Sequence, residues 1–258
     1  MLNQILAYKD LMLMLTMRDI RIRYKQAAMG FLWAIFMPLV AVCAGILIKK
    51  AMSVVSGQPM DMSGVVAIAV KVLPWTFFVS ALKFSVSSLV SNSNLITKIY
   101  FPRAVLPFAS MLACLFDLTI AFVVLTVVLT IFQVGVSTQL VWVPLIFILL
   151  ICFTAGLGLL LAAANLFYRD VRYVVEVILM FGIFFTPVFF EAEALGSWGG
   201  YILLNPVGTL LESLSRVVVH HQAPDLNWLL YAAIFSIAML WVGLKTFQEK
   251  EPFFAENI

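Results

Sequence analysis

The amino-acid sequence predicts an all-α integral membrane protein with six transmembrane helices. Its 258 residues are 64% hydrophobic and only 11% charged, whereas a soluble domain carries about 25% charged residues. No charged residue lies between Gln26 and Ile48, and this stretch is long enough to cross roughly 30 Å of hydrocarbon as a helix. A basic run with Arg18, Arg21 and Lys25 precedes it. Because such residues tend to stay in the cytoplasm, the N-terminus is predicted to lie there.

The six expected spans are the most apolar stretches of the chain, at residues 27–48, 66–90, 104–132, 141–166, 173–190 and 228–244. Most basic residues then fall on the predicted cytoplasmic side: Lys9, Arg18, Arg21, Arg23, Lys25, Lys98, Arg103, Arg169, Arg172, Lys245 and Lys250. Lys49, Lys50 and Arg216 fall outside. This asymmetry predicts a multi-pass protein of the cytoplasmic (inner) membrane with both termini in the cytoplasm.

The N-terminal segment, residues 1–25, mixes apolar and basic positions instead of forming a continuous apolar run. On a helix, Leu13, Met17 and Tyr24 would share one face, and Arg18 and Lys25 would lie on another. This pattern favours an interfacial helix with its apolar face toward the lipid. The alternative is an ordinary basic segment that flanks the first span.

The cytoplasmic connection between the second and third spans, residues 91–107, is longer than the roughly 2–8 residues that most helix connections need. It is polar at first, then short and amphipathic, and it is broken at Pro102. This order predicts a small helix beneath the membrane that is available to a partner, although an ordinary loop is the alternative. The predicted helix comprises Asn94, Leu95, Ile96, Thr97, Lys98, Ile99 and Tyr100.

The second span carries polar residues at helical spacing, at Ser80, Lys83, Ser87 and Ser91. A charge at the depth of Lys83 normally faces a bundle interior or a wet cavity. Lys83 is therefore expected either to pair with Asp117 of the third span or to help line a conduit. Lys71 lies closer to the outer end, where its ammonium is expected to snorkel to the interface.

The outer segment at residues 191–227 does not read as a simple loop. Its apolar residues recur at intervals and are interrupted at Asn205-Pro206, where a helix would break. This pattern predicts two short amphipathic helices that dip into the outer leaflet. In the fourth span, Thr154, Gly158 and Ala162 are spaced four apart, which lets neighbouring helices approach closely.

Several classes of function find no support in the sequence. No GxxxxGK[ST] phosphate loop is present, so any ATP hydrolysis must occur on another chain. No nucleophile or metal ligand set has motif spacing, and the adjacent His220 and His221 do not indicate a metal site. A secondary transporter that uses Asp117 or Glu176 as a proton carrier remains open. A membrane-embedded enzyme acting on lipid-linked sugars would need clustered acids on the outer loops, but these acids are scattered.

Six motifs occur in order over nearly the whole chain: RDIRIRYKQAAMGFLWAIFMP, LPWTFF, SNSNLITKIYFPRAVLP, NLFYRDVRYV, FFTPVFF and LNP. Together they resemble one family, the permease subunits of ABC exporters that move lipid-linked polysaccharides such as O-antigen, capsule and wall teichoic acid. The resemblance implies a homodimer with two copies of a cytoplasmic ATPase, which would hold ATP and Mg²⁺. It also implies that the small cytoplasmic helix couples to the ATPase, and that the outer helix pair forms a periplasmic gate. A polyprenyl-diphosphate-linked polysaccharide, with O-antigen foremost, is the expected substrate, with no cofactor in this chain and no nucleic acid as a partner.

This resemblance places the turn between the fourth and fifth spans where a lipid diphosphate would enter. Arg169 offers a planar fork of donors for phosphate oxygens, and Asp170 could hold that fork in position. Arg172 is a further candidate, and Tyr24, Phe31 and Tyr168 could stack on sugar faces. The alternatives are that the arginines are membrane anchors and that Asp170 caps the helix of the fifth span.

Overall fold

The computed structural model describes residues 7–25, 32–57 and 62–255, and these residues form helices and connecting turns without a strand. The α-helices are α2 (Lys9–Lys25), α3 (Leu32–Ser56), α4 (Met62–Ser91), α5 (Ser93–Lys98), α6 (Val105–Ile131), α7 (Trp142–Phe167), α8 (Val171–Gly182), α9 (Gly199–Leu203), α10 (Pro206–Val218) and α11 (Leu226–Lys250). Three 3₁₀-helices lie between or after them, η1 (Thr138–Val141), η2 (Ala192–Trp198) and η3 (Glu251–Ala255). The all-α prediction is confirmed.

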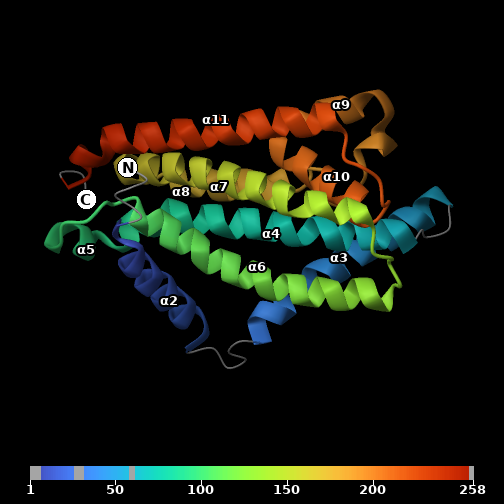
Figure 1. The fold of residues 1–258 in the computed structure, drawn as a ribbon, viewed down its shortest axis with the longest axis horizontal. Coiled ribbons are helices and arrows are strands. Elements are labelled where there is room, and N and C mark those ends of the chain that lie inside the picture. Colours follow the sequence, from blue (N-terminus) through green and yellow to red (C-terminus); the bar gives the residue numbers. More distant parts are fainter. Residues whose placement is uncertain (1–6, 26–31, 58–61, 256–258) are drawn as a thin grey trace.

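The long helices α4, α6, α7 and α11 run along the long axis of the molecule, and α2 crosses one end of this bundle at an angle (Figure 1). The segment α5 and the C-terminal end of α11 lie at that same end, which we call the α5 end. The helices α9 and α10 lie at the opposite end, the α10 end. In the described part of the chain, four helical stretches are long and apolar enough to cross a membrane: Ser63–Ser91, Val105–Ile131, Thr138–Phe167 and Leu226–Phe254.

The fifth span was expected at 173–190, but the helix in this stretch, α8, ends at Gly182. The chain continues in tight turns, in which Phe184 and Phe185 donate backbone hydrogen bonds to residues only three positions earlier. Pro187 explains the ending, since it has no N–H to donate and disfavours helical geometry at the residue before it. The Thr186 hydroxyl instead donates to the Gly182 carbonyl at 2.8 Å.

Helix α4 is the centre of the main apolar core. Most of its side chains are buried, and α3, α6, α7 and α10 all pack against it. The small residues expected to allow close packing in α7, Thr154, Gly158 and Ala162, are all buried, and Gly158 faces Ser85 of α4. Helices α7 and α11 approach each other even more closely, which the sequence did not predict. At Gly156 of α7 and Gly243 of α11 the two backbones are so near that an added Cβ would collide with the facing helix.

A second, smaller apolar cluster lies at the α5 end and joins elements distant in sequence. Its buried residues include Leu15 of α2, Ile96 of α5, Phe101 from the turn after α5, and Phe254 of η3. Polar contacts reinforce the join, because the Arg103 backbone N–H donates to Glu251 Oε1 at 2.7 Å and the Arg103 guanidinium donates to the Glu251 carbonyl. The C-terminal end of α11 is thereby attached to the segment that follows α5.

Candidate functional site

A cavity of about 670 Å³ opens beside the middle of α4, bounded by α2, α3 and α6. Aromatic side chains make up part of its wall, from Tyr24, Trp33, Phe77 and Phe84. Hydroxyl and charged groups make up another part, from Arg23, Thr76, Ser80 and Asp117. Such a mixture of ring faces and hydrogen-bonding groups is suited to a ligand that has both apolar and polar faces.

Asp117 is the polar centre of this cavity wall. Its Oδ2 lies 2.6 Å from Arg23 Nη1, and its Oδ1 accepts a hydrogen bond of 2.6 Å from the Tyr24 hydroxyl. The Arg23 guanidinium also lies over the Phe84 ring, 3.9 Å from its centroid. Burial, and then the hydrogen bond to Asp117, raise the pKa of the Tyr24 phenol above its usual value. The phenol therefore stays protonated and donates to the carboxylate at neutral pH.

The expected pairing of Lys83 with Asp117 is wrong, because Arg23 and Tyr24 occupy both carboxylate oxygens. Among the described residues Lys83 has no ion pair. Arg23 had been assigned only as a basic residue that orients the chain. Its ion pair with Asp117 could not be predicted from the sequence, because the two residues are 94 positions apart. Helical periodicity relates only residues within the same helix.

The polar residues predicted on α4 lie along one face of the helix. Ser80 lines the cavity, Ser87 is half-buried, and Lys83 and Ser91 are exposed. This face lies on the surface of the single chain and is not enclosed within it. Two further serines of α4, Ser85 and Ser88, point away from this face and are buried.

Helix α2 packs on the bundle through a face for which the sequence made no prediction. Leu15 and Thr16 are its buried residues, and the Thr16 hydroxyl lies 3.3 Å from the Ala109 carbonyl of α6. The predicted apolar residues Leu13 and Met17 are exposed, while Tyr24 turns to Asp117. The exposed apolar residues share an open groove with Arg18, Arg21 and Lys25.

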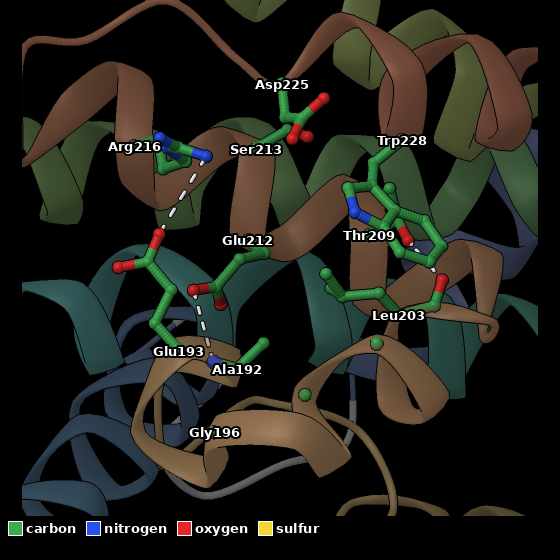
Figure 2. A pocket seen from close by; sticks show the side chains of 12 residues that line it. Ala192, Glu193, Gly196, Leu203, Thr209, Glu212, Ser213, Arg216, Asp225 and Trp228 are labelled. Carbon is green, nitrogen blue, oxygen red and sulfur yellow. Dashed lines mark hydrogen bonds and ion pairs between the residues drawn. The ribbon is translucent and has the colours of Figure 1, made fainter.

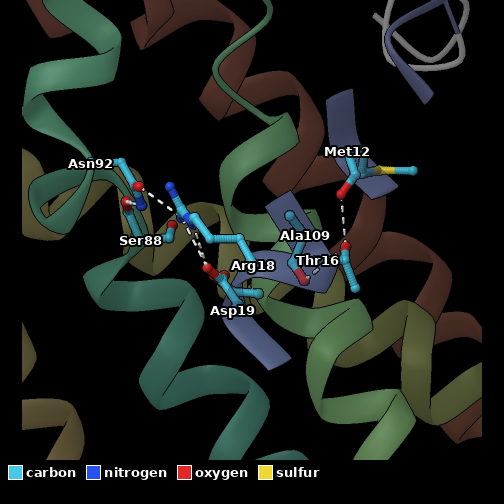
Figure 3. Close-up of polar contacts among 8 residues, drawn as sticks. Met12, Thr16, Arg18, Asp19, Ser88, Asn92 and Ala109 are labelled. Carbon is cyan, nitrogen blue, oxygen red and sulfur yellow. Dashed lines mark hydrogen bonds and ion pairs between the residues drawn. The ribbon is translucent and has the colours of Figure 1, made fainter. Parts of the chain in front are cut away.

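An arginine network connects α2 to the junction of α4 and α5 (Figure 3). The Arg18 guanidinium donates to Asp19 Oδ1 and, at 2.9 Å, to Asn92 Oδ1. The Asn92 amide in turn donates to the Ser88 carbonyl at 2.8 Å. The start of α5 is therefore held by α2 as well as by α4.

The predicted cytoplasmic helix exists as α5, although it is shorter and ends at Lys98. Its residues divide into two sets. Ile96 is buried and Leu95 is half-buried against the second apolar cluster, whereas Asn94, Thr97, Lys98, Ile99 and Tyr100 are exposed. Tyr100, directly after α5, has 93% of its surface exposed. The exposed set is therefore the part of α5 that another protein could contact.

The residues predicted for lipid-diphosphate access fall into two groups. Tyr24 belongs to the cavity beside α4, whereas Tyr168, Arg169 and Asp170 are exposed on the α7–α8 turn. Arg172 is paired with Glu176 at 3.2 Å. The structure does not support Asp170 as a side-chain cap: it occupies the residue before α8 but makes no capping hydrogen bond. Phe31 lies outside the described residues.

At the α10 end, the predicted snorkelling of Lys71 is wrong. The Lys71 side chain is only 1% exposed, and its Nζ lies 3.1 Å from Glu212 Oε2 of α10. It also donates to the Phe190 carbonyl at 2.7 Å, and Glu212 Oε1 accepts from the Ala192 N–H at 3.3 Å. Lys71 and Glu212 thus attach α10 and the segment after α8 to α4. Sequence reasoning missed this pair, since its members lie 141 residues apart.

The chain between α9 and α10 has the break that the sequence predicted at Asn205-Pro206. Helix α10 begins at Pro206, and the Asn205 side chain accepts a hydrogen bond from the Val207 N–H as its N-cap. The segment before the break consists of η2 and α9. Within the described residues no three His, Cys, Asp or Glu side chains are placed to hold a metal ion. His220 is instead 3.2 Å from Glu191.

Comparison with known proteins gives a consistent result along the chain. A family model described as ABC-2 type transporter matches residues 10–219. The O-antigen export system permease protein RfbA of Myxococcus xanthus is 26% identical over 261 residues, covering 100% of this chain and 99% of that protein. RfbA of Klebsiella pneumoniae is 27% identical, with 96% and 94% covered. The polysialic acid transport protein KpsM of Escherichia coli is 24% identical, with 92% of each chain covered.

Proposed function

The chain belongs to the ABC-2 type transporter family, and from this premise we propose that it is the membrane permease of an ABC exporter for lipid-linked polysaccharide. The end-to-end similarity to O-antigen export permeases carries this proposal, because it covers 100% of this chain and 99% of one such relative. O-antigen is the glycan class that we assign. Capsular polysaccharide is the alternative, given the similarity to a polysialic acid transport protein; teichoic acid rests only on the wider family resemblance.

We assign six crossings of the cytoplasmic membrane to this permease. The four long apolar stretches supply four of them, and α3 and the α8 segment supply the first and the fifth. In this topology the α5 end faces the cytoplasm, both termini are assigned to the same side, α2 lies in the inner interface, and α9 with α10 forms the outer gate. The basic residues of α2, α5 and the α7–α8 turn support this orientation through the positive-inside rule.

A separate ATPase is proposed as the energy source, with ATP and Mg²⁺ bound there and no catalytic site in this chain. The exposed residues of α5, together with Ile99 and Tyr100 directly after it, form the proposed contact surface, because these two side chains present apolar area at the end that we assign to the cytoplasm. The attachment of α5 to α2, α4 and η3 supports a role in transmitting ATPase movements to the spans.

Ile99→Asp is expected to abolish copurification of the ATPase subunit and export of the glycan, while the permease still accumulates in the membrane. A charge at this exposed position removes apolar contact area without entering the core. Copurification from detergent extracts and surface glycan provide the two measurements. Leu95→Asp is a poor substitute, because Leu95 packs on the second apolar cluster and its replacement would also damage the fold. Normal ATPase recovery with Ile99→Asp would remove α5 from the contact surface.

We propose a homodimer in which two copies enclose the substrate conduit. The cavity beside α4 and the face with Ser80, Lys83, Ser87 and Ser91 lie on the surface of one chain. A lysine with no ion-pair partner in the described part of the chain is costly against lipid, and a water-filled conduit between two copies would solvate it. The cavity then places Tyr24, Phe77 and Phe84 beside a passing sugar.

Arg169→Lys is expected to lower glycan export sharply while leaving ATPase association intact. Lysine keeps the positive charge but loses the bidentate geometry that a diphosphate favours. Arg169 is exposed on the α7–α8 turn with no partner among the described side chains, and so its donors remain available. Export is measured as surface glycan against glycan on the cytoplasmic leaflet. Arg172→Lys serves as the matched control, because Arg172 is already paired with Glu176. Normal export by Arg169→Lys would make Arg169 an anchor only.

The alternative of a proton-coupled secondary transporter receives less support. Of the two candidate carriers, Asp117 is paired with Arg23 and Tyr24 and Glu176 with Arg172. Each of these two carboxylates is therefore already engaged by an arginine of the same chain.

A further inference from the structure

A second cavity, of about 250 Å³, lies at the α10 end between η2, α9, α10 and the start of α11 (Figure 2). Arg216 and Glu193 lie on one side of it, Trp228 on the other, and Glu212 between them. Its volume is slightly below the range of about 300–1,000 Å³ that is typical of ligand pockets. This volume has room for about one small ring.

The hydrogen-bonding groups of this cavity are only partly used by the protein itself. Ser213 is 4% exposed, yet its hydroxyl has no hydrogen-bond partner among the described residues, although it lines the cavity. The Arg216 side chain makes only a loose ion pair of 3.9 Å with Glu193 there, so most of its five donors are free. One Asp225 oxygen caps α11 through the Asn227 N–H, and the other remains available.

The chemistry of the wall selects among possible ligands. The carboxylates of Glu193, Glu212 and Asp225 outnumber the single arginine of the lining, which disfavours a phosphate. The same carboxylates are not placed to hold a metal ion. A ligand with many hydroxyls satisfies the wall best, because each hydroxyl can donate to a carboxylate and accept from Arg216 or Ser213. Trp228 offers an aromatic face for the apolar C–H face of a sugar ring.

We propose that this cavity is a binding site for a single sugar residue of the glycan at the outer end of the permease. The assignment rests on the proposed function, since it requires that a glycan passes this end of the bundle. Its place between α9 and α10 means that the bound sugar contacts both helices of the outer pair at once.

Gly200→Cys provides a reporter for occupancy of the cavity. Gly200 lines the cavity, and a Cβ added there would meet no atom within 4 Å. The purified permease–ATPase complex is treated with a maleimide with and without methyl glycosides of glucose, mannose, galactose and rhamnose. At a glycoside concentration about ten times its dissociation constant, labelling of Cys at position 200 should slow about tenfold. The exposed Cys43 of α3 lies outside the cavity, so its labelling rate should not change.

Two further variants and one control decide the interpretation. Trp228→Ala removes the ring platform and Ser213→Ala removes one hydroxyl, and each should reduce the protection. Glycerol, which has hydroxyls but no ring face, should give none. Absence of protection by every glycoside, equal protection by glycerol, or full protection in both variants would overturn the proposal. Glycan export by the unaltered complex is measured in parallel: normal export without protection removes this sugar site and leaves the proposed function intact.

Discussion

Glu212→Ala is expected to destabilise the protein by about 3–5 kcal/mol, the range found when one member of a buried ion pair is removed. The Lys71 side chain is 1% exposed, and without Glu212 the Phe190 carbonyl would be the one hydrogen-bond acceptor that its ammonium keeps among the described residues. The Ala192 N–H would also lose its acceptor. Thermal unfolding of the purified permease in detergent, followed by the loss of monodisperse protein, provides the measurement.

Two other variants show whether charge or packing is responsible. Lys71→Met combined with Glu212→Leu replaces the pair by apolar groups, which is often nearly neutral, so the double variant should recover most of the lost stability. Arg216→Ala is the matched control on the same helix. Its ion pair with the exposed Glu193 is 3.9 Å long and should contribute little, about 0–1 kcal/mol. Equal stability of Glu212→Ala and Arg216→Ala would show that the buried pair does not hold α10 and the segment after α8 in place.

Local chemistry made some elements predictable from the sequence. Asn205 and Pro206 mark a helix start by themselves, because an N-cap side chain and a proline at the first turn act within one or two residues. The polar and then amphipathic run before Pro102 similarly indicated α5. The end of α8 depends on Pro187, and the expected span of 173–190 overran it because hydropathy continues through Phe189 and Phe190 although the helix does not.

The polar contacts of the candidate sites could not be predicted in the same way. Lys71 with Glu212, Arg23 with Asp117 and Arg103 with Glu251 each join segments at least 94 residues apart. Helical periodicity assigns a residue to a face, but it does not say which helix packs on that face. Lys83 illustrates the difference. Periodicity groups it with Ser80, Ser87 and Ser91 on one face but leaves pairing with Asp117 and lining of a conduit both open, and the structure shows that Arg23 and Tyr24 occupy Asp117.

Asp117→Asn is expected to loosen α2 from the bundle and to reduce glycan export strongly. Asp117 accepts from the Tyr24 hydroxyl and pairs with Arg23, with both distances at 2.6 Å. Hydrogen bonds to charged groups contribute about 1.5–3 kcal/mol, so amide hydrogen exchange in α2 should become about 10- to 100-fold faster. Tyr24→Phe removes only the phenol bond and should give a smaller increase.

The double variant Arg23→Gln with Asp117→Asn distinguishes attachment of α2 from a direct role in transport. Two neutral amides can hydrogen-bond to each other, so slow exchange in α2 should return for the most part. If the charged pair serves only to attach α2, export should return with it. If the cavity beside α4 needs the charges of Arg23 and Asp117 for passage of the glycan, exchange in α2 should become slow again while export stays low. This second result is the one that we expect. Unchanged hydrogen exchange in Asp117→Asn would instead show that Leu15, Thr16 and Arg18 hold α2 without this pair.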